Sequence, residues 1–238
     1  MCIYAICGFW IFPHPLQKFP IAPAAAFRYD LRMDLRQTIL NELNWKTSAG
    51  FTTSELQTIL AVGREIRDYV EALLPGGGAA WMQRNLGRTR LHRGGLPQWL
   101  VSAVNRQPTS LVFPVRDIWL TPDFDHYIRP HQHLTHEIGH VLDNRSGGWL
   151  PAIWFGKGHG DRLTRFLGGR PRGLRWTNGT CGIPTSVCWT APGASPTECG
   201  DLSTADYFAE AFAWAIYDAG RYPHPGTAEW VRERLRGM

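Results

Sequence analysis

The sequence predicts an α+β fold, in which a small, mostly antiparallel sheet packs against two central helices. Three observations lead to this prediction. Apolar residues recur at helical spacing in segments 131–144 and 203–220, and the segments 110–113 and 115–121 have the pattern of short strands. The chain has 238 residues, 44% of them hydrophobic, which is enough to bury a core.

The first 30 residues show no clear pattern of secondary structure. The apolar run at 2–12, followed by the alanine-rich stretch 22–26, resembles a signal peptide with a small-residue cleavage site. However, no lysine or arginine precedes the run, prolines follow it, and it is too short to cross a bilayer. We interpret 1–30 as a targeting or non-structural segment, and its presence in the mature protein stays open. Secretion is one alternative for the compartment, which is otherwise unknown.

Residues 31–78 are predicted to form an N-terminal helical portion. Segment 34–44 has the pattern of a short helix. In the next helix, Thr52 and Glu55 fit a capping box, and apolar residues recur at helical spacing from Leu56 to Leu73. We expect this helix to end before the glycine-rich stretch 75–80, so that a second domain covers residues 79–238.

The second domain begins with a short helix expected at 98–106, followed by the two strands. Segment 145–202 is rich in Gly, Pro, Trp and Thr, and shows helical periodicity only at 161–169. Long segments of this kind inside a compact domain are usually functional or contain small strands. Helices are expected again at 203–220 and 227–236.

The helix at 131–144 contains the motif HEIGH at positions 136–140. Residues four apart lie on one face of a helix, so His136 and His140 can offer two imidazole nitrogens to one Zn²⁺. Glu137 points about 100° away and can take a proton from a zinc-bound water as a general base. The alternative is a helix that carries two unrelated histidines. His133, one turn earlier, is either a rival ligand or, as is more usual for such a residue, a histidine at the surface.

A catalytic zinc ion requires three protein ligands and an open position for water. The helix at 203–220 contains Asp206 and Glu210, four residues apart in an apolar run, and both are candidates for the third ligand. Ser203 and Asp206 also fit a capping box, in which case Asp206 would bond to the start of its helix. Asp143 either supports the site or caps the end of the histidine helix.

The stretches HEIGHVLDN and DYFAEAFAW, in this order, resemble the zincin metallopeptidases with a carboxylate as third ligand. They are closest to the group that includes the catalytic domain of anthrax lethal factor. The resemblance is confined to these two helices. It implies a zincin-like fold, in which the sheet packs against the HExxH helix and a second, ligand-bearing helix. It also implies a zinc metalloendopeptidase with Asp206 as the metal ligand and Glu210 behind a ligating histidine.

Two positions depart from the family pattern. Asp206 is one methylene shorter than the usual glutamate, so either the helices approach more closely or Glu210 binds zinc instead. Cys199 stands where the family tends to have a tyrosine that stabilises the transition state. Three other residues are candidates for that role: His159, Tyr207 and Tyr127. Segment 118–120 is placed like the edge strand on which zincins align peptide substrates.

Charge and cysteine content add little to this interpretation. The net charge of +5 comes mostly from scattered arginines, which disfavours a nucleic-acid partner. The five cysteines match no usual CxxC zinc pattern, and one disulfide or free thiols are equal alternatives.

The sequence therefore predicts a zinc-dependent peptidase, a hydrolase, with a peptide or protein substrate and no transmembrane segment. One alternative is an inactive zincin that binds a peptide or another partner. A second alternative is a metal-dependent hydrolase of a non-peptide amide. Substrate, cleavage preference and oligomeric state stay open.

Overall fold

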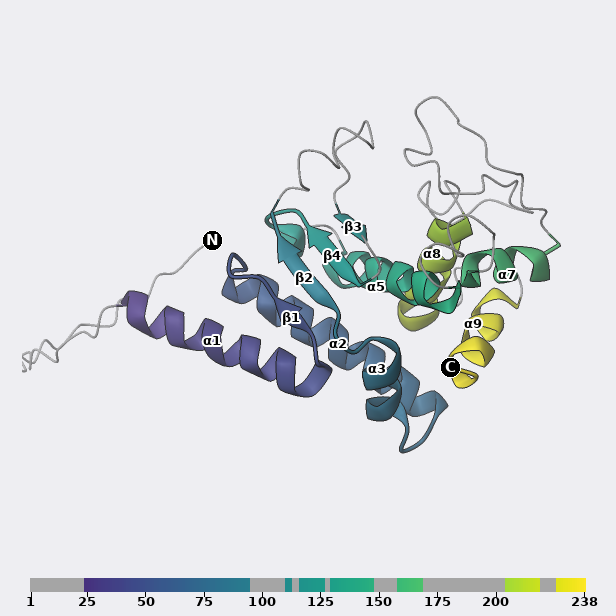
Figure 1. Ribbon diagram of the computed structural model, residues 1–238, viewed down its shortest axis with the longest axis horizontal. Helices are drawn as coiled ribbons and strands as arrows, with labels where there is room; N and C mark the ends of the chain where they lie inside the picture. Colours follow the sequence, from purple (N-terminus) through teal and green to yellow (C-terminus); the bar gives the residue numbers. More distant parts are fainter. Residues whose placement is uncertain are drawn as a thin grey trace, which may run out of the picture.

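The computed structural model describes residues 24–94, 110–112, 116–126, 129–147, 158–168, 204–218 and 226–238. Within these ranges, helices surround one small sheet (Figure 1), so the expected mixture of helices and a small sheet is confirmed. The helix expected at 98–106, all five cysteines and Tyr127 lie outside the described residues.

Three helices form the first part of the described chain: α1 (Ala24–Leu43), α2 (Thr53–Leu73) and α3 (Gly78–Asn85). α1 begins inside the segment for which the sequence shows no pattern. α2 starts with the predicted capping box, in which Glu55 N donates to Thr52 Oγ1 and Thr52 N donates to Glu55 Oε2 at 2.6 Å. The sequence does not predict α3, because its start lies within the glycine-rich stretch that favours a break.

The sheet contains β1 (Lys46–Thr47), β2 (Arg90–Arg93), β4 (Asp117–Leu120) and β3 (Ser110–Val112), in that spatial order. β1 pairs with β2, and β2 with β4, in parallel; only β3 pairs antiparallel with β4. The expectation of a mostly antiparallel sheet is therefore wrong. The reason is that α2 and α3 lie between β1 and β2 in the chain, and such a helical crossover returns the chain to run in the same direction.

β4 lies inside the sheet rather than at its edge. Segment 118–120 was expected to be an edge strand, but β4 has β2 on one side and β3 on the other, so that prediction is wrong. In the described part of the sheet, β3 is the edge next to β4. The faces differ in character: Leu91 and Ile118 are fully buried, whereas His92 and Trp119 stack on the opposite face with ring centroids 4.2 Å apart.

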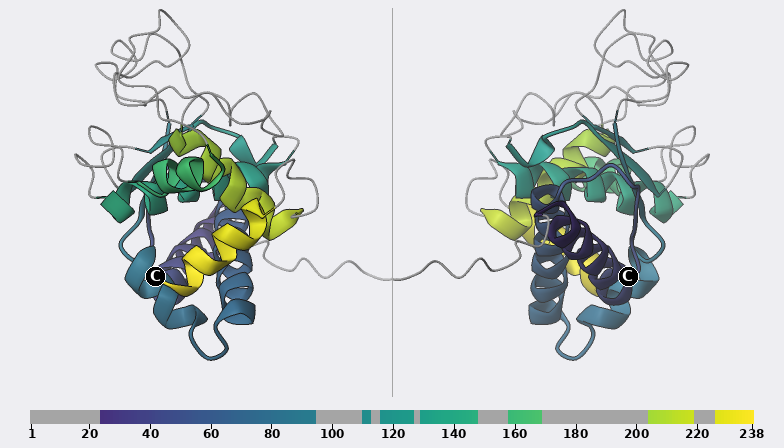
Figure 2. Two further views of the ribbon diagram at one scale, coloured as in Figure 1. Left: turned by 90° about the vertical axis from the view of Figure 1, so that its right-hand side faces the viewer. Right: turned by 90° about the vertical axis from the view of Figure 1, so that its left-hand side faces the viewer.

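The second half of the chain supplies the helices η1 (Phe124–His126), α5 (Pro130–Gly147), α7 (His159–Phe166), α8 (Thr204–Tyr217) and α9 (Thr227–Arg236). α5 and α8 pack against each other more extensively than any other pair of described elements, and α7 and α9 both lie against α8 (Figures 1 and 2). α5 also contacts β3 and β4. The two helices with the candidate ligands are therefore central.

The N-terminal part shares its core and its sheet with the rest. β1 pairs with β2, and apolar side chains of α2, α5, α8 and α9 belong to one buried cluster. Glu55, fully buried, accepts from Arg93 Nε at 2.7 Å and from Asp123 N at 3.0 Å, which ties the start of α2 to the end of β2 and to the turn after β4. None of the described helices combines the length and apolar character that crossing a bilayer requires.

Candidate metal centre

The helices α5 and α8 approach each other at backbone level. A Cβ added at Gly139 of α5 would lie 2.7 Å from Ala209 Cα on α8. A second close approach occurs at the start of α8, where a Cβ added at Gly160 of α7 would overlap the carbonyl oxygen of Thr204. Neither position has room for a side chain, so α8 lies close to α7 at Thr204 and close to α5 at Ala209, and Asp206 lies between these two contacts beside the short gap that separates α5 from α8.

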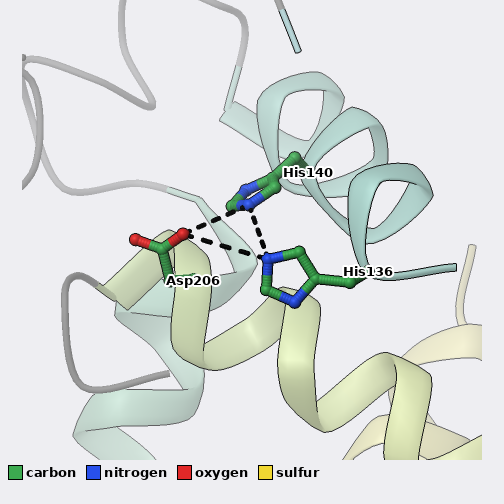
Figure 3. Close-up of side chains that lie close together, drawn as sticks. All are labelled: His136, His140 and Asp206. Carbon is green, nitrogen blue, oxygen red and sulfur yellow. Dashed lines mark hydrogen bonds and ion pairs between the residues drawn. The ribbon is translucent and has the colours of Figure 1, made fainter. Parts of the chain in front are cut away.

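Three candidate ligand atoms converge in this gap, and we call the set the ligand triangle: His136 Nε2, His140 Nε2 and Asp206 Oδ1 (Figure 3). The two nitrogens are 3.2 Å apart, and the oxygen lies 3.3 Å from His140 Nε2 and 4.0 Å from His136 Nε2. Two ligands about 2.1 Å from a tetrahedral zinc ion lie about 3.4 Å apart, so two of these separations fit such an ion and the third is longer. Among the described residues, this is the one group of three or more such side chains that could hold a metal ion.

The protonation of the two imidazole rings is compatible with a cation that takes the place of a proton in the ligand triangle. His136 Nδ1 lies 3.1 Å from Glu210 Oε2, and this carboxylate favours the tautomer whose lone pair is on Nε2. Burial alone would lower the pKa of His140, but its hydrogen bond to Asp206 and the charges of nearby carboxylates raise it to about 9. At neutral pH His140 therefore holds a proton beside Asp206 and His136, in the position where a metal ion would bind.

Glu210 lies on the other side of His136 from the triangle. Its Oε1 accepts a hydrogen bond of 2.6 Å from Trp214 Nε1, while its Oε2 faces His136 Nδ1. The Glu210 side chain is 7% exposed, compared with 25% for Asp206. The structure thus brings Asp206 to the Nε2 atoms of both histidines and places Glu210 where it orients one ring. Ser203, the alternative capping partner of Asp206, lies outside the described residues.

Asp143 connects the histidine helix to α7. It is buried, and its Oδ1 accepts from Gly160 N at 2.7 Å; the backbone N–H of His159 also donates to it. Burial raises the pKa of Asp143 to about 6, although these backbone donors oppose the rise. α7 is in turn tied to the start of α8, because Thr204 Oγ1 donates to Asp161 Oδ1 at 3.2 Å.

Glu137 lies beside the histidine pair without contributing to the converging atoms. It directly follows His136 in α5, its side chain is buried, and it is not among the three converging residues. Its charge raises the pKa of His140, and it opposes the burial that lowers the pKa of His133. His133, the rival ligand, is not part of the ligand triangle.

The described candidates for stabilising a transition state are packed in the core. His159 is 1% exposed, and its Nδ1 accepts from Arg234 Nε at 2.9 Å. Burial, helped by the charges of Arg234 and Arg162, lowers the pKa of His159 to about 3, so its ring is neutral. Tyr207 is fully buried on α8. Neither side chain is exposed to a substrate at the ligand triangle.

A second polar cluster at the other end of the α5–α8 pair was not identified from the sequence. We call it the Glu65 network: Glu65, His131, Thr135 and Tyr217. Tyr217 OH donates to Glu65 Oε2 at 2.6 Å and lies 3.1 Å from Thr135 Oγ1, while His131 Nδ1 lies 2.9 Å from Glu65 Oε1. In the sequence, the only sign of the Glu65 network is the position of Thr135 beside His136. Its carboxylate, Glu65, comes from α2, which is far away in the chain.

Trp214 was also not identified from the sequence, although it holds Glu210. Its spacing of four residues after Glu210 places both on one face of α8. An aromatic residue at such spacing is usually interpreted as core, and only the indole N–H shows the polar contact.

The chain matches no protein-family model, and no curated protein or solved structure is significantly similar to it. The resemblance to zincins therefore rests on the two helical motifs alone. Two histidines and an aspartate are not specific to zincins, so the geometry by itself describes a group that can hold a metal ion of a kind still to be identified.

Proposed function

We propose that this protein is a zinc-dependent metallopeptidase, in which His136, His140 and Asp206 hold Zn²⁺ and Glu137 is the general base. The observation that carries the proposal is the ligand triangle, in which two of the three separations, 3.2 and 3.3 Å, are close to those of ligands on one tetrahedral zinc ion. Its two histidines lie on α5, the helix that also bears the buried carboxylate of Glu137. The two motifs that resemble zincins supply all four of these residues.

The donor set favours zinc over calcium and magnesium. Two imidazoles and one carboxylate leave a fourth position for water, as in catalytic zinc sites. Calcium and magnesium prefer oxygen ligands, and calcium requires six to eight of them. When bound, a zinc ion lowers the pKa of its water and polarises a carbonyl.

The protein's own residues would then divide the remaining work. Glu137 takes a proton from the attacking water and returns it to the leaving amine. Glu210 keeps the His136 ring turned so that Nε2 faces the ligand triangle. β3, the edge strand next to β4 in the described sheet, contacts α5 and is the strand on which an extended peptide would pair.

The variant Glu137→Gln tests the proposal. It keeps the shape of the side chain and removes the base, so we expect it to retain stoichiometric zinc and to lose about 10²- to 10⁴-fold in kcat/KM on a responsive peptide. Glu229→Gln, an exposed glutamate on α9, is the matched control and should hydrolyse the peptide like the parent protein. An unchanged rate in Glu137→Gln, or a parent protein without bound zinc, would refute the proposal.

One observation favours a second candidate function. Because His159 and Tyr207 are both buried, neither offers a donor to a developing oxyanion. A zincin-like module that binds a peptide through its metal ion without cleaving it fits this arrangement. Zinc-bound protein that captures members of a peptide library and turns over none of them would support the second function against the first.

A further inference from the structure

We infer that the spacing between α5 and α8 is matched to an aspartate ligand, so that Gly139 and Asp206 act as one unit. The inference rests on the proposed metal site and adds to it a positioning role for Gly139. It explains why the shorter carboxylate stands at the ligand position. It also makes a statement about metal binding that does not depend on any peptide substrate.

The first part of the argument is that α8 rests on two glycines that flank Asp206. Gly160 contacts α8 two residues before Asp206, at Thr204, and Gly139 contacts it three residues after, at Ala209. A Cβ at position 139 would lie 2.7 Å from Ala209 Cα, 3.1 Å from its Cβ and 3.2 Å from its carbonyl oxygen. No side-chain rotation can relieve these contacts, so a larger residue at 139 must move the helices apart.

The second part concerns the length of the ligand. Asp206 Oδ1 lies 3.3 Å from His140 Nε2, close to the separation of two ligands on one zinc ion, and 4.0 Å from His136 Nε2, so aspartate reaches the site with little length to spare. Glutamate would extend the carboxylate by about 1.5 Å, one carbon–carbon bond, whereas zinc–ligand distances tolerate deviations of only about 0.2 Å. At the present helix spacing, glutamate would overshoot. With α8 displaced outward, aspartate would fall short and glutamate would reach.

The third part is that α8 cannot simply shift along α5 to compensate. Its first residue, Thr204, is bound to Asp161 of α7, and α7 is bound through Gly160 N to Asp143 of α5. This chain of hydrogen bonds resists a slide of α8 along the histidine helix, so separation of the two helices is the movement left to relieve a contact at Gly139. Helix spacing and ligand length must therefore change together.

Four proteins test the inference: the parent, Gly139→Ala, Asp206→Glu and the double variant, each titrated with Zn²⁺ against a chromophoric chelator. We expect each single variant to bind zinc about 10- to 100-fold more weakly than the parent. The double variant should bind more tightly than Gly139→Ala, so Asp206→Glu weakens binding in one background and strengthens it in the other. The visible spectrum of the Co²⁺ forms should report the same reversal.

The matched control is Gly63→Ala on α2, where an added Cβ would meet the Leu43 side chain far from the ligand triangle. This variant should lose stability, and Asp206→Glu should not improve its zinc affinity. If Gly139→Ala does not fold, the zinc affinity of Asp206→Glu alone tests the inference, because this variant leaves the contact between Gly139 and Ala209 intact. A parent protein and an Asp206→Glu variant with equal zinc affinity overturn the inference and leave the proposed function standing; a parent that binds no zinc overturns both.

Discussion

The two ends of the α5–α8 pair carry polar clusters that are built in different ways. In the Glu65 network, donors and acceptors are matched: Thr135 can donate to Tyr217, Tyr217 donates to Glu65, and Glu65 faces the Nδ1 of His131. In the ligand triangle, two imidazole nitrogens and a carboxylate oxygen face one another, with one proton of His140 available to be shared among them.

This difference separates two kinds of polar cluster that look alike in a list of residues. A cluster in which every donor finds an acceptor within the cluster stabilises the fold and orients its side chains, and it needs no ion. A cluster whose lone pairs converge on one point leaves a deficit of positive charge, which a cation can fill. The following predictions contrast the two ends.

The largest expected contrast is between two histidines of α5. His140→Ala removes one of three ligands, so zinc affinity should fall on the order of a thousandfold. His131→Ala, nine residues earlier on the same helix, should leave zinc affinity unchanged and lower the free energy of unfolding. Chelator competition and urea titration measure the two effects. Equal losses of zinc affinity in both variants would contradict the contrast.

The next prediction uses the buried carboxyl of Asp143. Folding raises its pKa from 3.8 to about 6, so the folded state holds the proton more tightly than the unfolded state. This contribution is present at low pH and is lost as pH rises from about 4 to about 6. It amounts to about 3 kcal/mol, at 1.36 kcal/mol for each pKa unit.

Urea titrations of the metal-free parent and of Asp143→Asn measure it. Relative to the variant, the parent should lose stability as the pH is raised through this window. The effects of titrating groups that do not interact with Asp143 cancel in the difference, whereas His140 and Asp161 interact with its charge and contribute to it. Stability curves that stay parallel from pH 4 to pH 7 would show that Asp143 does not change its proton affinity on folding.

A smaller effect is expected at Glu210, which belongs to neither cluster but orients a member of the triangle. Glu210→Gln keeps the side chain's shape and weakens its hold on His136 Nδ1, so zinc affinity should fall about tenfold. Trp214→Phe, which removes the N–H that holds Glu210, should act in the same direction and less strongly. A thousandfold loss in Glu210→Gln would mean instead that Glu210 is itself a ligand.

The smallest effect is expected for Tyr217→Phe in the Glu65 network. Loss of the hydroxyl removes a hydrogen bond to Glu65 and one to Thr135, and should lower the free energy of unfolding by about 1–2 kcal/mol. Zinc affinity should stay within error of the parent's. A change in zinc affinity larger than that of Glu210→Gln would show that the two ends of the helix pair are not independent.

The helices α2, α5, α8 and α9 were predictable because their signals are local. The capping box of Thr52 and Glu55, and the helices near 131–144, 203–220 and 227–236, follow from residues close together in the chain. The sheet was not predictable. β1 has two residues and β2 four, too few for an alternating pattern, and parallel pairing depends on where the helical crossovers return the chain.

The candidate site shows the same division. The spacing of His136 and His140 identifies a pair on one helix face, and Asp206 and Glu210 identify a second. The choice between the two carboxylates depends on the distance between the two helices. The contact of Gly139 with Ala209 sets this distance, and no local sequence pattern predicts it. The sequence left open whether Asp143 supports the site or caps its helix, because its acceptor role toward α7 depends on tertiary packing.

The separation of the ligands along the chain also has a consequence in time. Synthesis proceeds at roughly 5–20 residues per second, so the 66 residues from His140 to Asp206 take about 3–13 s to be made. During that interval the histidine helix exists without the helix it packs against most extensively. Any ion captured then would be held by two imidazoles of an unfinished domain. Asp206 is the last of the three candidate ligands to be synthesised, so the site can be completed only together with the packing of α8 on α5.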